Sequence, residues 1–185
     1  MQKANSSNPP PSRRRKRLGL VRDQRGAVAI EFGLLALPFF ALVGATLETS
    51  MVFFASEVLD SAVDDATRLI RTGQAQDFDL DDFRAAVCSR TFSLFDCAAI
   101  HFRVTPVVDF ASASPDPAVS IDCEAPCDFT ATQDFDPGSG SSIILVQANY
   151  KWPIILDIGG FALANMGDNT RLMSSVRVLR NEPFS

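Results

Sequence analysis

An uncharged, strongly apolar run is the strongest constraint on how this chain can fold. The run covers residues 32–47 (FGLLALPFFALVGATL) and follows directly after Glu31. Together with the segment from Ala27 to Glu31, it reaches about the 20 residues that cross a bilayer as a helix. We therefore expect a transmembrane helix over residues 27–50.

The charge of the chain divides at this run. Residues 1–26 carry eight Lys or Arg and one Asp, a net charge of +7, whereas the nine basic and 21 acidic residues that follow give −12. A basic stretch beside an apolar span is typical of a cytoplasmic segment, so we expect a cytoplasmic basic leader over residues 1–26. A nucleic-acid-binding arm is the alternative, but the apolar span behind it disfavours that interpretation, and we expect no nucleic-acid partner.

The helix should continue well beyond the membrane. Between Ala27 and Gly73 only Pro38 interrupts the helical pattern. At ~1.5 Å per residue the helix would be roughly 70 Å long, which exceeds a hydrocarbon layer of about 30 Å. Residues 51–73 are expected to form an amphipathic continuation that packs on the rest of the chain, with a neighbouring subunit as the alternative. The apolar stripe of this continuation consists of Met51, Ala55, Val58, Leu59, Ala62, Ala66, Leu69 and Ile70.

The remaining residues, 74–185, are expected to form a small periplasmic α+β domain. A short helix is predicted over residues 80–89, and strands over residues 99–108, 143–152 and 172–179. Between the strands, residues 111–142 are rich in Ser, Pro, Asp and Gly and are expected to form a long loop. The fold class is therefore α+β, with a long N-terminal pilin-like helix packed on a small antiparallel sheet.

All four cysteines lie in the domain that would be translocated, namely Cys88, Cys97, Cys123 and Cys127. Thiols on that side of the membrane become oxidised, so two disulfides are expected. Three pairings are possible, and we favour the local one, Cys88 with Cys97 and Cys123 with Cys127. A zinc site is the alternative, although neither spacing is that of a paired C-x-x-C knuckle.

The most informative motif is RGAVAIEF at residues 25–32. In it, Gly26 is followed by four small or apolar residues and then by Glu31. An acid inside the apolar layer costs on the order of a few kcal/mol, so such residues usually mark function. We therefore expect Glu31 to require a charged partner.

These residues resemble the type III signal of type IV prepilins and, more closely, the TadE-like family. The resemblance continues with Pro38, Gly44 and Glu48, with residues 62–75 at the end of the helix, and with residues 180–184 (RNEPF). It implies a TadE-like pseudopilin, or minor pilin, of the tight-adherence (Tad/Flp) type IV pilus system.

The resemblance also implies a processing site. A membrane-embedded aspartic prepilin peptidase would cut between Gly26 and Ala27, so that Glu31 becomes the fifth residue of the mature subunit. Cleavage would create an α-amino group at the bilayer interface. The Glu31 carboxylate of one subunit would then neutralise the α-ammonium group of a neighbouring subunit. Conventional pilins begin with an N-methylated Phe, a pattern from which Ala27 departs.

Other interpretations of the motifs are less favoured. Residues 43–45 imitate the end of a secretory signal, but the apolar stripe continues beyond them. His101, the one histidine, is expected to be a solvated strand residue rather than a catalytic base, and Tyr150 and Trp152 are expected on a core face rather than in a recognition patch. The acidic residues 77–82 and 134–136 lack the spacing of a known calcium loop and are expected to be solvated.

We therefore expect a non-enzymatic, single-pass inner-membrane protein without cofactor or metal, with a cytoplasmic N-terminus and a periplasmic domain. It would act in pilus assembly and surface attachment. The expected partners are the membrane, the prepilin peptidase, the major pilin, another pseudopilin and the inner-membrane pilus platform. The alternative is a membrane-anchored periplasmic binding protein with an uncleaved signal anchor.

Overall fold

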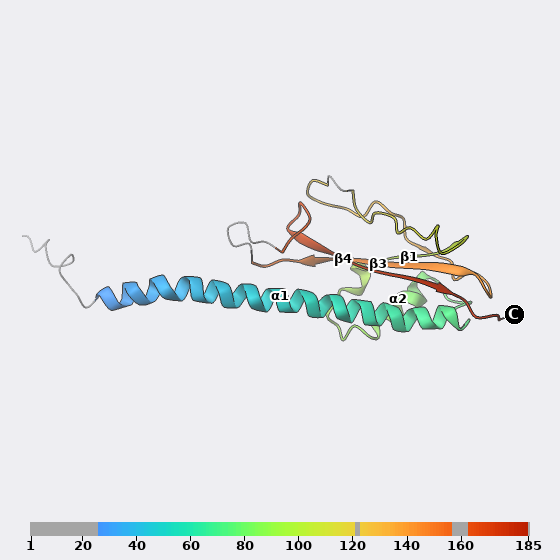
Figure 1. Cartoon of the computed structure of the whole chain (residues 1–185), viewed down its shortest axis with the longest axis horizontal. Coiled ribbons are helices and arrows are strands. Elements are labelled where there is room, and N and C mark those ends of the chain that lie inside the picture. Colours follow the sequence, from blue (N-terminus) through green and yellow to red (C-terminus); the bar gives the residue numbers. More distant parts are fainter. Residues whose placement is uncertain (1–25, 121–122, 157–162, 185) are drawn as a thin grey trace, which may run out of the picture. The chain divides into compact units, whose positions relative to one another are not determined.

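The computed structural model describes residues 26–120, 123–156 and 163–184, so the expected leader lies outside the described residues apart from Gly26. The chain divides into two compact units, Met1–Leu42 and Val43–Ser185, and the first helix contributes to both. The elements, in chain order, are α1 (Ala27–Arg71), α2 (Leu80–Cys88), the 3-10 helix η3 (Cys97–Ala99), β1 (His101–Val107), β2 (Asp134–Phe135), β3 (Ile143–Pro153) and β4 (Thr170–Arg180) (Figure 1).

Helix α1 begins at the predicted Ala27 and ends at Arg71, two residues before the predicted end at position 73. It continues through Pro38. Gly73 has a left-handed backbone with φ of 79°, a conformation that Gly adopts without steric cost. The Gln74 N–H donates to the Leu69 carbonyl at 2.9 Å and so satisfies one of the last helical acceptors.

The acidic segment before α2 acts as a helix cap. The Asp79 side chain accepts hydrogen bonds from the backbone N–H groups of Asp81 and Asp82, both at 2.8 Å. The Asp82 side chain in turn accepts the Asp79 N–H at 3.2 Å, which completes a capping box. These exposed carboxylates therefore start the predicted short helix, whose Phe83 and Val87 are buried as expected.

The sheet has the order β2-β1-β3-β4. The pairs β1–β3 and β3–β4 are antiparallel, as expected, and they confirm the predicted α+β class. The pair β1–β2 is parallel, which corrects the expectation of a purely antiparallel sheet. Strand β2 also lies inside residues 111–142, where only a loop was predicted, and its two residues pair with Arg103 and Val104 of β1.

The amphipathic part of α1 packs on one face of this sheet, so the predicted packing on the same chain is confirmed. Its buried residues are Val52, Ala55, Leu59, Ala62, Val63, Ala66, Thr67 and Ile70. One prediction within the stripe was wrong, because Met51 is 49% exposed. Two residues that the predicted stripe did not include, Val52 and Val63, are buried. The 3.6-residue period gives the width of the stripe, but the sheet beneath it decides its edge.

The core face of β3 contains the aromatic pair that was expected there. Tyr150 is buried and Trp152 packs beside it, and both rings lie against Phe95, at centroid distances of 4.9 and 5.7 Å. On the opposite face of the sheet, Ala118, Val119 and Cys127 form a smaller cluster. Figure 1 shows this second covering as the loop that runs between β1 and β2. The sheet is therefore covered on both faces, by α1 on one and by a loop on the other.

The chain segment after β4 closes the end of α1. The Glu182 N–H donates to the Arg71 carbonyl at 2.9 Å, and the two side chains form an exposed ion pair at 3.6 Å. The Asn181 side chain donates to the carbonyls of Pro137 and Ser139, at 2.8 and 3.0 Å. The RNEPF motif thus joins the helix end to the loop before β3.

Candidate functional site

The first candidate site is the start of α1, where the sequence predicted processing. Gly26 lies directly before the helix, and a Cβ added to it would meet no atom of the described residues within 4 Å. Ala27 is the first helical residue, and Glu31 lies one turn further on with its side chain exposed. Within the described part of the chain, the Glu31 carboxylate forms no hydrogen bond or ion pair.

The helix that follows presents apolar side chains on all sides. Its large apolar residues from position 28 to 47 are 60 to 74% exposed: Val28, Ile30, Phe32, Leu34, Leu35, Leu37, Phe39, Phe40, Leu42 and Leu47. Soluble domains rarely expose a continuous apolar surface of this extent. By length and composition, α1 is able to cross a membrane.

A second acid lies at the far end of the apolar run, and its role differs from that of Glu31. The Glu48 Oε1 accepts the backbone N–H of Ile155 at 2.6 Å, and both Glu48 carboxylate oxygens lie 3.1 Å from the N–H of Leu156. One turn earlier, a Cβ added to Gly44 would lie 3.0 Å from Leu156 Cδ1. Glu48 and Gly44 therefore fix the segment after β3 against the helix. The sequence located both residues but not their partner, which is more than 100 positions away.

The four cysteines form two disulfides, Cys88–Cys97 and Cys123–Cys127. The first connects α2 to η3 at the edge of the main core, and the second lies in the loop over the opposite face of the sheet. This is the local pairing. The thiolates that a zinc site would need are therefore bonded to one another.

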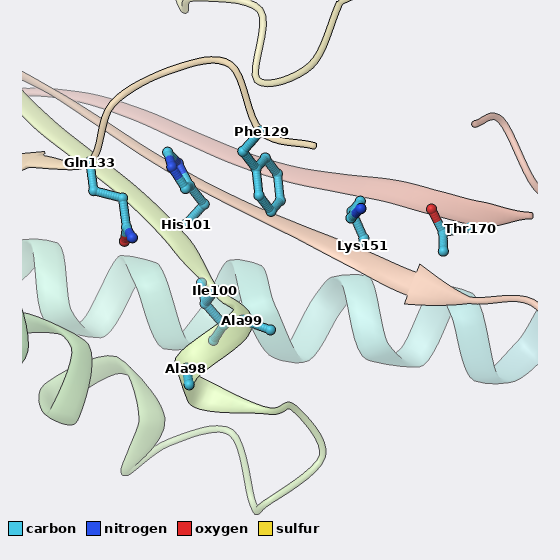
Figure 2. A pocket seen from close by; sticks show the side chains of 8 residues that line it. All are labelled: Ala98, Ala99, Ile100, His101, Phe129, Gln133, Lys151 and Thr170. Atoms are coloured by element: carbon cyan, nitrogen blue, oxygen red, sulfur yellow. The ribbon is translucent and has the colours of Figure 1, made fainter. Parts of the chain in front are cut away.

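A shallow cavity of about 360 Å³ lies beside the start of β1 (Figure 2). Its wall includes His101 and Phe129, whose rings stack at a centroid distance of 4.7 Å. Lys151 lines the same cavity, and its Nζ donates to the Cys127 carbonyl at 2.8 Å and to Asp168 at 3.1 Å. The remaining lining residues are Ala98, Ala99, Ile100, Gln133 and Thr170.

His101 is partly buried in this wall, which corrects the expectation of a solvated side chain. Burial lowers its pKa from the usual 6.5, and the positive charge of Arg84 lowers it further. The ring is therefore neutral at pH 7. The side chains that line the cavity include His101, Lys151 and Thr170 but no Ser or Cys.

The acidic residues at 134–136 are engaged locally. The Asp134 side chain accepts the Phe135 N–H, and the Asp136 side chain accepts the Gly138 N–H, each at 2.9 Å. Across the described residues 26–120, 123–156 and 163–184, no group of three or more His, Cys, Asp or Glu side chains is arranged to hold a metal ion.

The long apolar helix with an acid near its start and the small α+β domain are the features that the sequence predicted for a pilin-like protein. Residues 26–68 match the family model described as TadE-like protein, so the chain carries a TadE-like domain. This domain implies a pilin-like protein associated with the Tad pilus, in a family whose members are generally structural rather than enzymatic. No curated protein and no solved structure shows a significant match to the chain.

Proposed function

We propose that this protein is a minor pilin, or pseudopilin, of the tight-adherence pilus, cleaved by a prepilin peptidase between Gly26 and Ala27. One observation carries the proposal: the TadE-like domain begins at Gly26, and α1 begins at the next residue. The peptide bond to be cut therefore directly precedes the first residue of α1. Gly26 itself has a 3-10 conformation, and the absence of a side chain on it leaves the bond accessible to a protease.

The mature protein is proposed to sit in the inner membrane with α1 as its single span. The leader would remain cytoplasmic because of its positive charge, and the domain after α1 would be periplasmic. Oxidised cysteines support this orientation, because the four of them form disulfides and a periplasm keeps such bonds intact.

Glu31 is proposed to act in assembly rather than in folding. Its carboxylate has no partner in the described part of its own chain, although it precedes an uncharged run that would lie in lipid. The α-amino group of Ala27 on a neighbouring subunit would supply the missing positive charge. The proposed neighbours are the major pilin and another pseudopilin, held at the inner-membrane platform during assembly and surface attachment.

The mature N-terminus tests this proposal directly. We expect mass spectrometry of the protein isolated from its own cells to find a chain that begins at Ala27. A Gly26→Val variant should accumulate uncleaved, whereas Gly33→Val, at a second glycine with no atom within 4 Å of an added Cβ, should be cleaved normally. A mature chain that begins at Thr46, or that keeps the arginine-rich leader, would refute processing by a prepilin peptidase.

The cavity beside β1 favours a second candidate, a periplasmic binding protein held by an uncleaved anchor. Its stacked rings and the Lys151 ammonium could hold a small ligand with a planar or anionic part. The same mass spectrum separates the two candidates, because this one predicts an N-terminus at Met1 or Gln2.

A further inference from the structure

The connection that follows β3 carries an apolar tip beside the membrane-spanning part of α1. Ile154 is buried in the main core, whereas Ile155 is 85% exposed. Ile155 is followed by Leu156, the residue whose side chain contacts α1 at Gly44.

Two contacts fix the level of the helix at which this tip is held. The Glu48 carboxylate binds the N–H groups of Ile155 and Leu156, so the tip lies beside the residue that directly follows the uncharged run. The Leu156 side chain reaches one turn further, to Gly44. Gly44 lies three positions before Leu47, the last residue of the uncharged run, so Leu156 reaches a level roughly 4 to 5 Å inside the run.

The hydrogen bonds explain how backbone can be held at this depth. An N–H group that faces lipid without an acceptor is strongly unfavourable, and loops are therefore excluded from the hydrocarbon unless their polar groups are satisfied. The Glu48 carboxylate accepts both of the N–H groups at the tip, in hydrogen bonds that its charge strengthens. These two N–H groups consequently need no acceptor from outside the chain.

We propose that the tip at Ile155 and Leu156 inserts into the outer face of the lipid bilayer, with Glu48 as the residue that positions it. The occupant of this surface is lipid rather than another protein because the tip is continuous with the exposed apolar surface of α1 at Leu47. The inference rests on the proposed function in one respect: α1 must span a membrane. It adds that the periplasmic domain touches the membrane at a second point.

Such a contact would define the tilt of the domain on the membrane. One helix alone leaves the domain free to rotate about its axis and to lean, whereas two contacts hold one side of the sheet toward the lipid. The domain would then have one orientation on the membrane before the subunit is assembled. Glu48 serves here as a structural counterpart to Glu31, because its negative charge is satisfied within the chain.

Depth-dependent quenching tests the proposal in the full-length protein. Because all four native cysteines are paired in disulfides, a single introduced cysteine is labelled selectively with an environment-sensitive fluorophore. The variants Ile155→Cys, Leu37→Cys and Val108→Cys are reconstituted in vesicles of phosphatidylethanolamine and phosphatidylglycerol that contain nitroxide-labelled lipids. Val108 is the matched control, because it is 93% exposed and follows the end of β1 that pairs with Ile143, at the far end of β3 from Ile155.

We expect strong quenching at Leu37 by nitroxides deep in the acyl chains. With shallow nitroxides we expect quenching at Ile155 to be several-fold stronger than the weak quenching at Val108. If Leu37 is quenched but shallow quenching at Ile155 equals that at Val108, this inference is wrong. The membrane span in the proposed function would still stand. The absence of quenching at Leu37 would overturn both.

A second variant separates positioning by Glu48 from a merely hydrophobic contact. In the Ile155→Cys background, Glu48→Ala should reduce shallow quenching at position 155, and Glu48→Gln, which keeps one acceptor oxygen, should retain part of it. Quenching at Leu37 should not change in either case. Full quenching at position 155 in Glu48→Ala would refute the role assigned to Glu48.

Discussion

Phe184 packs over Gly73, the residue at which the chain leaves α1. A Cβ at position 73 would lie 2.9 Å from both Cγ and Cδ1 of the Phe184 ring. Gly140 also lies under this residue, because a Cβ there would come within 2.3 Å of the Phe184 carbonyl oxygen. The end of the helix, the loop before β3 and the RNEPF motif thus meet at one point.

A side chain at Gly73 should disturb this junction. Because Gly73 has φ of 79° and the Phe184 ring against it, we expect Gly73→Ala to lower the free energy of unfolding by about 1–3 kcal/mol. Thermal unfolding followed by circular dichroism of the full chain in detergent measures the loss. Gly33→Ala, where nothing lies within 4 Å, is the control and should cause none. Equal stability of the two variants would contradict the assigned packing.

Two residues of the predicted apolar stripe should respond very differently to truncation. Leu59 is 1% exposed, so Leu59→Ala should destabilise the domain by about 2–5 kcal/mol through the cavity it leaves. Met51 is half exposed, and Met51→Ala should change the unfolding free energy little. Chemical denaturation of both variants measures the difference. A large loss of stability in Met51→Ala would show that Met51 belongs to the buried stripe, as the sequence predicted.

Substitutions of Glu31 and Glu48 in α1 should separate assembly from folding. We expect Glu31→Ala to leave the unfolding transition unchanged and to reduce the amount of the protein that co-purifies with pili or pilus subunits. Glu48→Ala should leave the α1 span in the membrane but loosen the segment at Ile155 and Leu156, which hydrogen exchange of those two amides would detect. Normal processing together with normal incorporation of Glu31→Ala would show that the proposed charge pairing is wrong.

His101 should make stability depend on pH. Its folded-state pKa is lowered mainly by burial, so between that value and the unfolded value near 6.5 the unfolded chain binds more protons. The unfolding free energy should therefore be highest above about pH 6.5 and fall as the pH drops below it. His101→Phe keeps a ring against Phe129 and removes this titration, so its stability should be flatter over the same range. Identical pH profiles would exclude His101 as the cause.

A different group dominates at lower pH. Burial alone would raise the pKa of Asp168, but hydrogen bonds from Thr170 and Lys151 and the charge of Lys151 outweigh it and lower the pKa. The stabilisation from Asp168 is therefore lost only as the pH falls below about 3.8, outside the window of His101.

Loss of the Cys88–Cys97 disulfide should destabilise the domain measurably. Its closed loop is short, with a sequence separation of 9, so the chain-entropy estimate for the double variant Cys88→Ala/Cys97→Ala is about 2–3 kcal/mol. Denaturation of the oxidised protein and of the variant gives the difference. A thiol probe on the unreduced protein supplies the control, since four reactive thiols would show that neither bond forms.

Much of this fold is visible in the sequence because its signals are local. The uncharged run and Gly73 define α1, and alternating residues define β1, β3 and β4 almost to their ends. Strand β2 is invisible to the same reasoning, because two residues have no period and Asp134–Phe135 becomes a strand only by pairing with Arg103 and Val104.

The candidate site shows the same division between local and distant information. Gly26 and Glu31 can be found from the motif around them. Glu48 can be found as a charge at the end of the run, but its acceptor role requires Ile155 and Leu156, which only tertiary structure brings to it. His101 was misplaced for a similar reason: Phe129, whose ring covers it, comes from a loop without any regular pattern.

The outermost strand β4 has a consequence for how copies of this protein can meet. An unprotected edge strand of 11 residues would allow strands of other subunits to pair with it, and the subunits would then aggregate in the membrane. Three arginines on β4 are each bound within the molecule: Arg171 to the Leu163 carbonyl, Arg177 to Asp60 and Asp64, and Arg180 to the Ser141 carbonyl. These side chains are engaged within the molecule, and charged residues along an edge strand disfavour the addition of a foreign strand.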